Sequence, residues 1–146
     1  MDYEEYEKTC AVIRQENDFF LSLFEKDLTT QGLSPKTINK HLNNVDFYLN
    51  DYMLYSEARH MEEGISMIDD FLGNFFIRKC MWSTPATIKS TATSIKKFYK
   101  CMAENGKIEK DAYSYLCHQI KDNMSDWQAD CAQYNDADAP SPFSFI

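Results

Sequence analysis

Apolar residues recur at every third or fourth position along most of this chain, which is the spacing of one face of an α-helix. The clearest stretch runs over residues 83–106. It opens with Thr84 and Pro85, which are typical of the N-cap and first position of a helix, and it closes with Asn105 and Gly106. Its apolar stripe predicts one buried face and is formed by Ile88, Ala92, Ile95, Tyr99 and Met102.

A second helix with the same kind of cap is predicted from Ser34, because Pro35 lies fifty positions before Pro85. Both capped helices follow an apolar segment with the pattern Phe-Leu-x-x-Phe. We therefore interpret residues 16–54 and 65–104 as two helical hairpins that form an internal repeat. The stripe of the earlier capped helix is formed by Ile38, Leu42, Val45, Leu49 and Tyr52.

The two ends of the chain carry the same helical spacing. From Tyr3 to Leu28 it predicts either one long helix or an extension that leads into a second helix at about Glu16. The spacing after Gly106 predicts a last helix. The expected fold is all-α, a bundle of four to five helices built from two hairpins and a C-terminal helix. Its expected parts are a helical extension (1–15), the bundle domain (16–108), a C-terminal helix (109–134) and a tail (135–146).

Composition favours a folded helical protein, since 44% of the residues are hydrophobic and only four are glycine. No apolar run approaches the roughly 20 residues that a membrane-spanning helix needs. The acidic start MDYEEYEK lacks the basic and then apolar character of a secretory signal. We therefore expect a cytoplasmic protein that contacts no membrane.

The five cysteines and three histidines are widely separated, with no Cys-x-x-Cys and no His-x-x-x-His spacing. The wide separation and the absence of these two motifs favour buried free thiols over disulfides or a metal site. No metal ion and no other cofactor is expected.

Charge is distributed unevenly along the chain. Residues 78–107 carry seven Lys or Arg and one acid, Glu104, in a chain whose net charge is −8. The lysines of the helix expected over 83–106 stand on a second stripe, roughly a quarter turn or more from the apolar one. We expect this stripe to stay in water, and it is formed by Lys89, Thr93, Lys96 and Lys100, with Lys97 beside it.

Two runs of the sequence carry a family resemblance. They are GLSPKTINKHLNNVDFYLNDYM from residue 32 and IDDFLGNFFIRKCMWSTPATIKSTATSIKKFYKCMAENGKI from residue 68. The motifs are the Gly-Leu-Ser-Pro-x-Thr helix start, the Ser/Thr-x-x-Thr-Ile helix that finishes in Phe-Tyr, and the Glu-x-Gly-x-Ile turn. Residues 16–108 thereby resemble the N-terminal core-binding domain of tyrosine recombinases and phage integrases, a SAM-like four-helix module.

In that family the module forms half of a clamp around duplex DNA and presents its second and fourth helices to the major groove and nearby phosphates. The resemblance implies a DNA-binding domain from a mobile element, related to DNA integration and recombination. Asp46 would face phosphate with the wrong sign, which weakens the earlier helix as a DNA-binding face. The implied DNA contacts are Lys36, Thr37, Lys40 and His41 on the earlier helix, and Lys89, Thr93, Lys96, Lys97 and Lys100 on the later one.

The residues that cut DNA in this family are not expected in this chain. Their catalytic domain supplies arginines, a lysine, a histidine and the nucleophilic tyrosine, whereas only 39 residues follow residue 107. No histidine is followed by Arg at the third position, and Tyr134 has no activating arginines beside it in the sequence. There is also no glycine-rich phosphate loop. We assign no catalytic residue and expect no enzymatic activity.

Two functions stay open at this point. The first is a non-catalytic module that binds duplex DNA weakly and in a salt-sensitive way, because acidic residues dominate both ends of the chain. The second is a protein interaction module that has kept the fold and lost DNA binding. Its partner would be a recombinase or a second copy of this chain.

Overall fold

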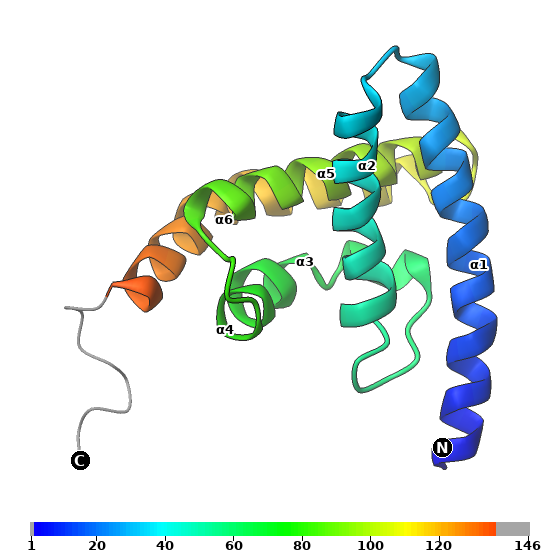
Figure 1. The fold of residues 1–146 in the computed structure, drawn as a ribbon, viewed down its shortest axis with the longest axis horizontal. Coiled ribbons are helices and arrows are strands. Elements are labelled where there is room, and N and C mark those ends of the chain that lie inside the picture. The colour runs from blue at the N-terminus through cyan, green and yellow to red at the C-terminus, as the bar shows by residue number, and fades with distance from the viewer. Residues whose placement is uncertain (1, 137–146) are drawn as a thin grey trace.

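The computed structural model describes residues 2–136, and every regular element in this range is helical (Figure 1). The all-α prediction is therefore confirmed. Residues 137–146, most of the expected tail, lie outside the described range. The helices are α1 (Tyr3–Thr30), α2 (Pro35–Asp46), α3 (Ile68–Asp70), α4 (Phe76–Lys79), α5 (Pro85–Glu104) and α6 (Lys110–Asn135), with the short elements η1 (Phe47–Tyr52), η2 (Met61–Ile65) and η3 (Phe71–Phe75) between them.

α1 is one unbroken helix, so the single long helix is the alternative that is observed, and the expected boundary at residue 16 falls inside it. Asp2 caps this helix by accepting from the Glu5 amide at 2.8 Å. The polar residue in the middle of its apolar stripe, Asn17, is buried and donates to the side-chain oxygen of Asn50 at 2.7 Å. This bond gives the amide nitrogen a partner inside the protein, whereas the buried Oδ1 atom has no hydrogen-bond partner among the described residues. The N-terminal half of α1 packs through Cys10 and Ile13 against Leu54.

The two predicted helix starts are present. The Ser34 hydroxyl accepts from the Thr37 amide at 3.3 Å, and the Thr84 hydroxyl accepts from the Thr87 amide at 3.1 Å. Each cap satisfies an amide that has no partner within the helix, and the proline that follows it has no amide hydrogen to satisfy. After α5, Gly106 takes a φ of 70°, a left-handed conformation that ends the helix without steric cost.

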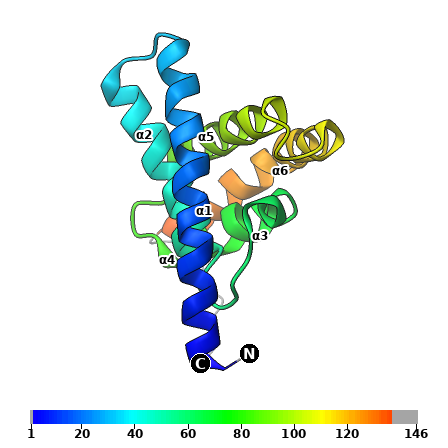
Figure 2. The same cartoon turned by 90° about the vertical axis from the view of Figure 1, so that its right-hand side faces the viewer.

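Two helix pairs cross each other in this fold. α1 and α2 form the first pair, as predicted for the first hairpin, whereas α5 lies along α6 (Figure 1). α2 crosses α5 and joins the two pairs, and α3 and η3 pack against α6 (Figure 2). The second hairpin within 65–104 therefore differs from the expectation, because α5 takes α6 rather than the preceding segment as its long neighbour.

Trp127 of α6 explains why the segment before α5 packs on α6. Its indole is buried, and the ring nitrogen donates to the Asp69 carboxylate at 2.7 Å. Gly73 makes room for the ring, since a Cβ at this position would lie 2.8 Å from the indole Cδ1. The large apolar surface of Trp127 thus ties α6 to the Ile68–Lys79 segment across a sequence separation of more than fifty residues.

The core is rich in aromatic rings, and π-helical turns place several of them. The Met53 amide donates to the Tyr48 carbonyl across five residues, and the Phe76 amide does the same to Phe71. The rings of Tyr48 and Tyr52 each lie 4.8 Å from the Phe71 ring. Such turns shift side-chain directions along a helix, so we attribute the tight ring cluster to them.

Candidate nucleic-acid interface

The lysine stripe of α5 lies in solvent. Lys89, Lys96 and Lys100 are exposed, and Lys97 is half-buried at one edge of the stripe. Thr93 is exposed too, but its hydroxyl donates to the Lys89 carbonyl at 3.0 Å within the helix. The stripe is therefore held on the outside of α5 because the opposite face of this helix is packed in the core.

α2 brings further lysines to the same side of the molecule. Lys36 and Lys40 are exposed one turn apart on α2. Burial lowers the pKa of the His41 imidazole, and the charges of Lys97 and Lys40 lower it further. Lys40 of the earlier helix and Lys97 of the later helix therefore lie near the same ring. The fold therefore brings one lysine from each predicted set of DNA contacts to the crossing of α2 and α5.

His41 and Thr37 are engaged inside the protein. The Nδ1 atom of His41 lies 2.7 Å from the hydroxyl oxygen of Ser94, and the ring is half-buried. The Ser34 hydroxyl lies 3.0 Å from the hydroxyl of Thr37, which belongs to the cap of α2. Both residues thus have structural partners, and their contact with DNA stays a prediction.

Ser94 holds the crossing of α2 and α5, a role that was not predicted from the sequence. Its hydroxyl is buried, donates to the Ser90 carbonyl at 3.1 Å and accepts from the Asn44 amide at 3.0 Å. A hydroxyl has one hydrogen to donate, so the His41 Nδ1 must be the donor to Ser94. The signal in the sequence was a small hydroxyl residue on the buried flank of an otherwise apolar stripe.

Asp46 lies on the other flank of α2. Its carboxylate accepts from the Asn50 amide at 2.6 Å, and Asn50 in turn accepts from Asn17 of α1. The acid is thus directed toward α1, whereas His41 and Asn44 on the opposite flank face α5. The negative charge of Asp46 therefore argues less strongly against a DNA-binding face on α2.

Three exposed aspartates of α6 lie away from the flank of this helix that faces α5. Gln128 donates to the Pro85 carbonyl at 3.0 Å, and Lys121 lines a hollow together with Lys96, so this flank of α6 faces α5. At 100° per residue, three exposed aspartates stand roughly 100–180° around the axis of α6 from these two residues. The lysine stripe is therefore left uncovered by the acidic residues Asp122, Asp126 and Asp130.

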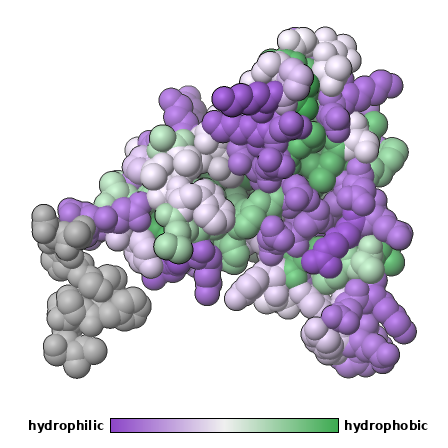
Figure 3. Space-filling view, in the orientation of Figure 1, coloured by the Kyte–Doolittle hydropathy of each residue, from purple (hydrophilic) through white to green (hydrophobic). Residues whose placement is uncertain are grey.

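Within residues 2–136, no lysine on α2 or α5 forms an ion pair with a carboxylate. The ion pairs in this range join Arg59 to Glu57 and His60 to Glu16. Figure 3 shows hydrophilic side chains gathered at the angle between the upper half of α2 and α5. The positive charges on this face are therefore free to meet an anionic ligand. We call this face the basic surface, and it consists of Lys36, Lys40, Lys89, Lys96, Lys97 and Lys100.

A second surface is aromatic and lies at the turn between α4 and α5. Met81 is 100% exposed and Trp82 is 56% exposed. The Trp82 ring lies 5.8 Å from the ring of Phe47, which continues toward Phe75 at 6.4 Å. Exposed apolar groups of this size often mark a binding surface. We call this face the aromatic surface, and it consists of Phe47, Tyr55, Phe75, Met81 and Trp82.

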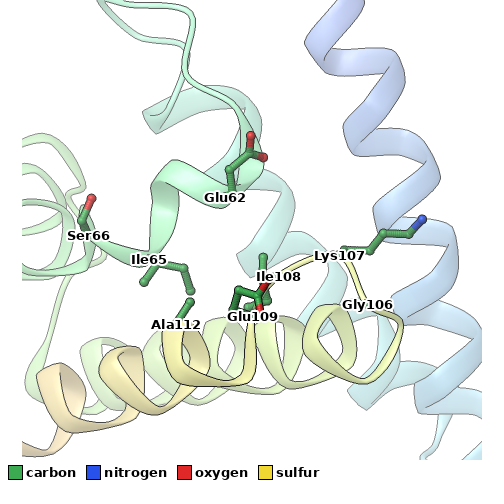
Figure 4. A pocket seen from close by; sticks show the side chains of 8 residues that line it. All are labelled: Glu62, Ile65, Ser66, Gly106, Lys107, Ile108, Glu109 and Ala112. Atoms are coloured by element: carbon green, nitrogen blue, oxygen red, sulfur yellow. The ribbon is translucent and has the colours of Figure 1, made fainter.

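A further hollow lies between η2 and the start of α6. In this hollow, Lys107 extends away from Glu62, and Ser66 stands on the far side (Figure 4). Its ionisable groups therefore do not converge on one point. In the described part of the chain, no three His, Cys, Asp or Glu side chains gather to hold a metal ion. No helix there has both the length and the apolar character to cross a membrane.

Comparisons with known proteins give one partial match. No family model matches the chain, and no solved structure matches it. The chain is 26% identical over 98 residues to the DNA mismatch repair protein MutS of Ehrlichia ruminantium (strain Gardel). The match covers 67% of this chain and 12% of that protein. The resemblance to recombinase core-binding domains stays a prediction.

Proposed function

We propose that this chain is a non-catalytic DNA-binding module that contacts duplex DNA through the basic surface. The observation that carries the proposal is the crossing of two helices, α2 and α5, each of which exposes lysines that pair with no carboxylate of residues 2–136. Lys40 of α2 and Lys97 of α5 lie near the same imidazole ring, although they are far apart in sequence. No carboxylate of residues 2–136 is paired with either lysine.

The physical basis is the release of counterions from DNA. Each lysine that neutralises a phosphate releases condensed cations, which makes binding favourable at low salt and weaker as salt rises. The first amides of α2 add to this attraction, since a helix N-terminus carries partial positive charge beside Lys36. Because the whole chain has a net charge of −8, we expect weak binding with a steep dependence on salt.

Two similarities favour DNA as the partner. The sequence motifs resemble a recombinase domain that holds duplex DNA, which also suggests an origin in a mobile element. The partial match is to a protein whose name assigns it to DNA mismatch repair. Both similarities are limited to part of a longer protein. They therefore support DNA as the class of ligand, and they give no support for transferring the enzymatic activity of either longer protein to this chain.

The proposal is tested by fluorescence anisotropy of a labelled duplex of about 20 base pairs, titrated at ~20 to ~200 mM salt. Wild type is compared with a variant in which Lys89, Lys96, Lys97 and Lys100 are changed to Gln. Four or five phosphate contacts predict a slope of about −4 when the logarithm of the association constant is plotted against the logarithm of the salt concentration. The slope of the variant should be close to zero.

The matched control removes four exposed lysines outside the basic surface. It changes Lys8, Lys26, Lys79 and Lys107 to Gln, which gives the same change in net charge. Its salt slope should stay close to that of wild type, because slope reports the phosphates contacted rather than the total charge. An equal loss in both variants, or no binding by the folded protein at the lowest salt, would overturn the proposal.

A second candidate function is favoured by the aromatic surface. Met81 and Trp82 expose apolar area that a protein partner would cover, and aromatic residues dominate the centres of many interfaces. In this case the chain would hold a second copy of itself or a recombinase. Sedimentation velocity over a concentration series tests the first partner. Self-association that Trp82→Ser and Met81→Ser abolish, without binding to duplex DNA, would favour this function over the first.

A further inference from the structure

The basic surface is bordered by a hollow between α5 and α6, and Lys96 is the one residue of its described lining that belongs to the predicted DNA contacts. The hollow has a volume of about 260 Å³ and is lined by Lys96, Cys117, His118, Ile120 and Lys121. Lys96 belongs to the stripe of α5, whereas the other four residues come from α6. Two lysines from two helices thus line one hollow.

The wall of this hollow suits an anion. The Ile120 side chain is 9% exposed and forms an apolar part of the lining. The Nδ1 atom of His118 lies 2.8 Å from the Ser114 carbonyl, which can only accept, so this nitrogen carries a hydrogen and is occupied. Among residues 2–136, no carboxylate lines the hollow. Lys96 and Lys121 therefore set its charge.

We infer that this hollow seats one backbone phosphate of duplex DNA between Lys96 and Lys121, which extends the DNA footprint from α5 onto α6. The inference rests on the proposed function, since the phosphate belongs to the same duplex. Lysine recognises phosphate as a point charge and needs no fixed hydrogen-bond geometry, so two flexible stems on either side are sufficient. Lys121 thereby becomes a further contact that neither the motif resemblance nor the stripe on α5 predicts.

Cys117 provides a natural reporter for this hollow. It is half-buried and lines the hollow, whereas Cys10, Cys80, Cys101 and Cys131 are all buried. A thiol reagent such as N-ethylmaleimide should therefore modify Cys117 first in the folded protein. A phosphate and sugar seated over the hollow would shield this thiol from the reagent.

The first experiment measures the rate of Cys117 alkylation by N-ethylmaleimide with and without saturating duplex at low salt. We expect at least a severalfold slower reaction in the complex, and Cys117→Ser should remove the fast phase altogether. Unchanged labelling in a complex that anisotropy shows to be formed would overturn the phosphate seat while leaving the proposed function intact.

The second experiment removes the new contact alone. Lys121→Gln should reduce the magnitude of the log–log salt slope by about 0.9, the value for one phosphate, and Lys8→Gln should leave it unchanged. A slope for Lys121→Gln equal to that of wild type would overturn the inference. Failure of wild type to bind the duplex at any salt would overturn both the inference and the proposed function.

Discussion

His41 of α2 and Ser94 of α5 meet where their helices cross, with the ring Nδ1 2.7 Å from the hydroxyl oxygen. Ser94 is fully buried and also accepts from Asn44, so one hydroxyl joins two residues of α2 to α5. Lys40 and Lys97 are both close enough to this imidazole to lower its pKa, so we expect the contact that packs the helices to influence the spacing of these two lysines as well.

Changing Ser94 to Ala should destabilise the fold. The substitution leaves the His41 and Asn44 donors without their partner, which typically costs about 1–3 kcal/mol of unfolding free energy. Urea denaturation followed by circular dichroism measures this cost. Thr93→Ala is the neighbouring control and should stay within about 0.5 kcal/mol, because Thr93 is exposed. Equal stability of the two variants would contradict the role of Ser94.

The stability of the protein should depend on pH through His41. The folded-state pKa of this imidazole is lowered, first by burial and then by Lys97 and Lys40, so the unfolded chain binds its proton more readily. The neutral ring therefore makes its full contribution to the free energy of unfolding above the ordinary histidine pKa of about 6.5. This contribution is lost as the pH falls from there through the folded-state pKa.

This dependence is measured as the urea midpoint at pH values on either side of about 6.5. His41→Gln should show a smaller fall in stability over this window than wild type, since the other titrating groups are common to both proteins. An identical pH dependence of the two midpoints would show that His41 does not contribute.

Gly64 is required by the hydroxyl of Tyr99. A Cβ at residue 64 would lie 2.0 Å from this hydroxyl oxygen, which donates to the Met61 carbonyl at 2.6 Å. Gly64→Ala should therefore destabilise the protein by about 1–3 kcal/mol through overpacking. In a Tyr99→Phe background the oxygen is absent, so the same substitution should cost less. A double-mutant cycle from urea denaturation checks this, and strict additivity would contradict the contact.

The five thiols should differ in reactivity. Burial raises the pKa of the Cys80 thiol to about 11, and burial with help from Asp27 and Glu104 raises the pKa of the Cys101 thiol to about 11. Both should react slowly with 5,5′-dithiobis(2-nitrobenzoate) near pH 8, because the thiolate is the reacting form. Cys117 should react first in the folded protein and all five in urea. Rapid reaction of more than one thiol without denaturant would contradict the observed packing.

Helix starts and ends could be predicted from the sequence because they depend on neighbours within a few positions. The caps at Ser34 and Thr84 and the turn at Gly106 stand where the residue types indicated. The apolar stripe and the exposed lysine stripe of α5 also followed, since both are set by 100° of rotation per residue. These features need no knowledge of the rest of the fold.

The tertiary structure alone decided which helices meet. The bond between His41 and Ser94 joins residues 53 positions apart, and the bond between Trp127 and Asp69 joins residues 58 apart. Local spacing cannot specify such partners, because many pairs of amphipathic helices share the same pattern. The pairing of α5 with α6, the turning of the aspartates away from the lysine stripe and the hollow at Lys121 all depend on these distant contacts. The sequence by itself thus determined the helices and their charged faces, and long-range packing decided which of those faces are open to a ligand.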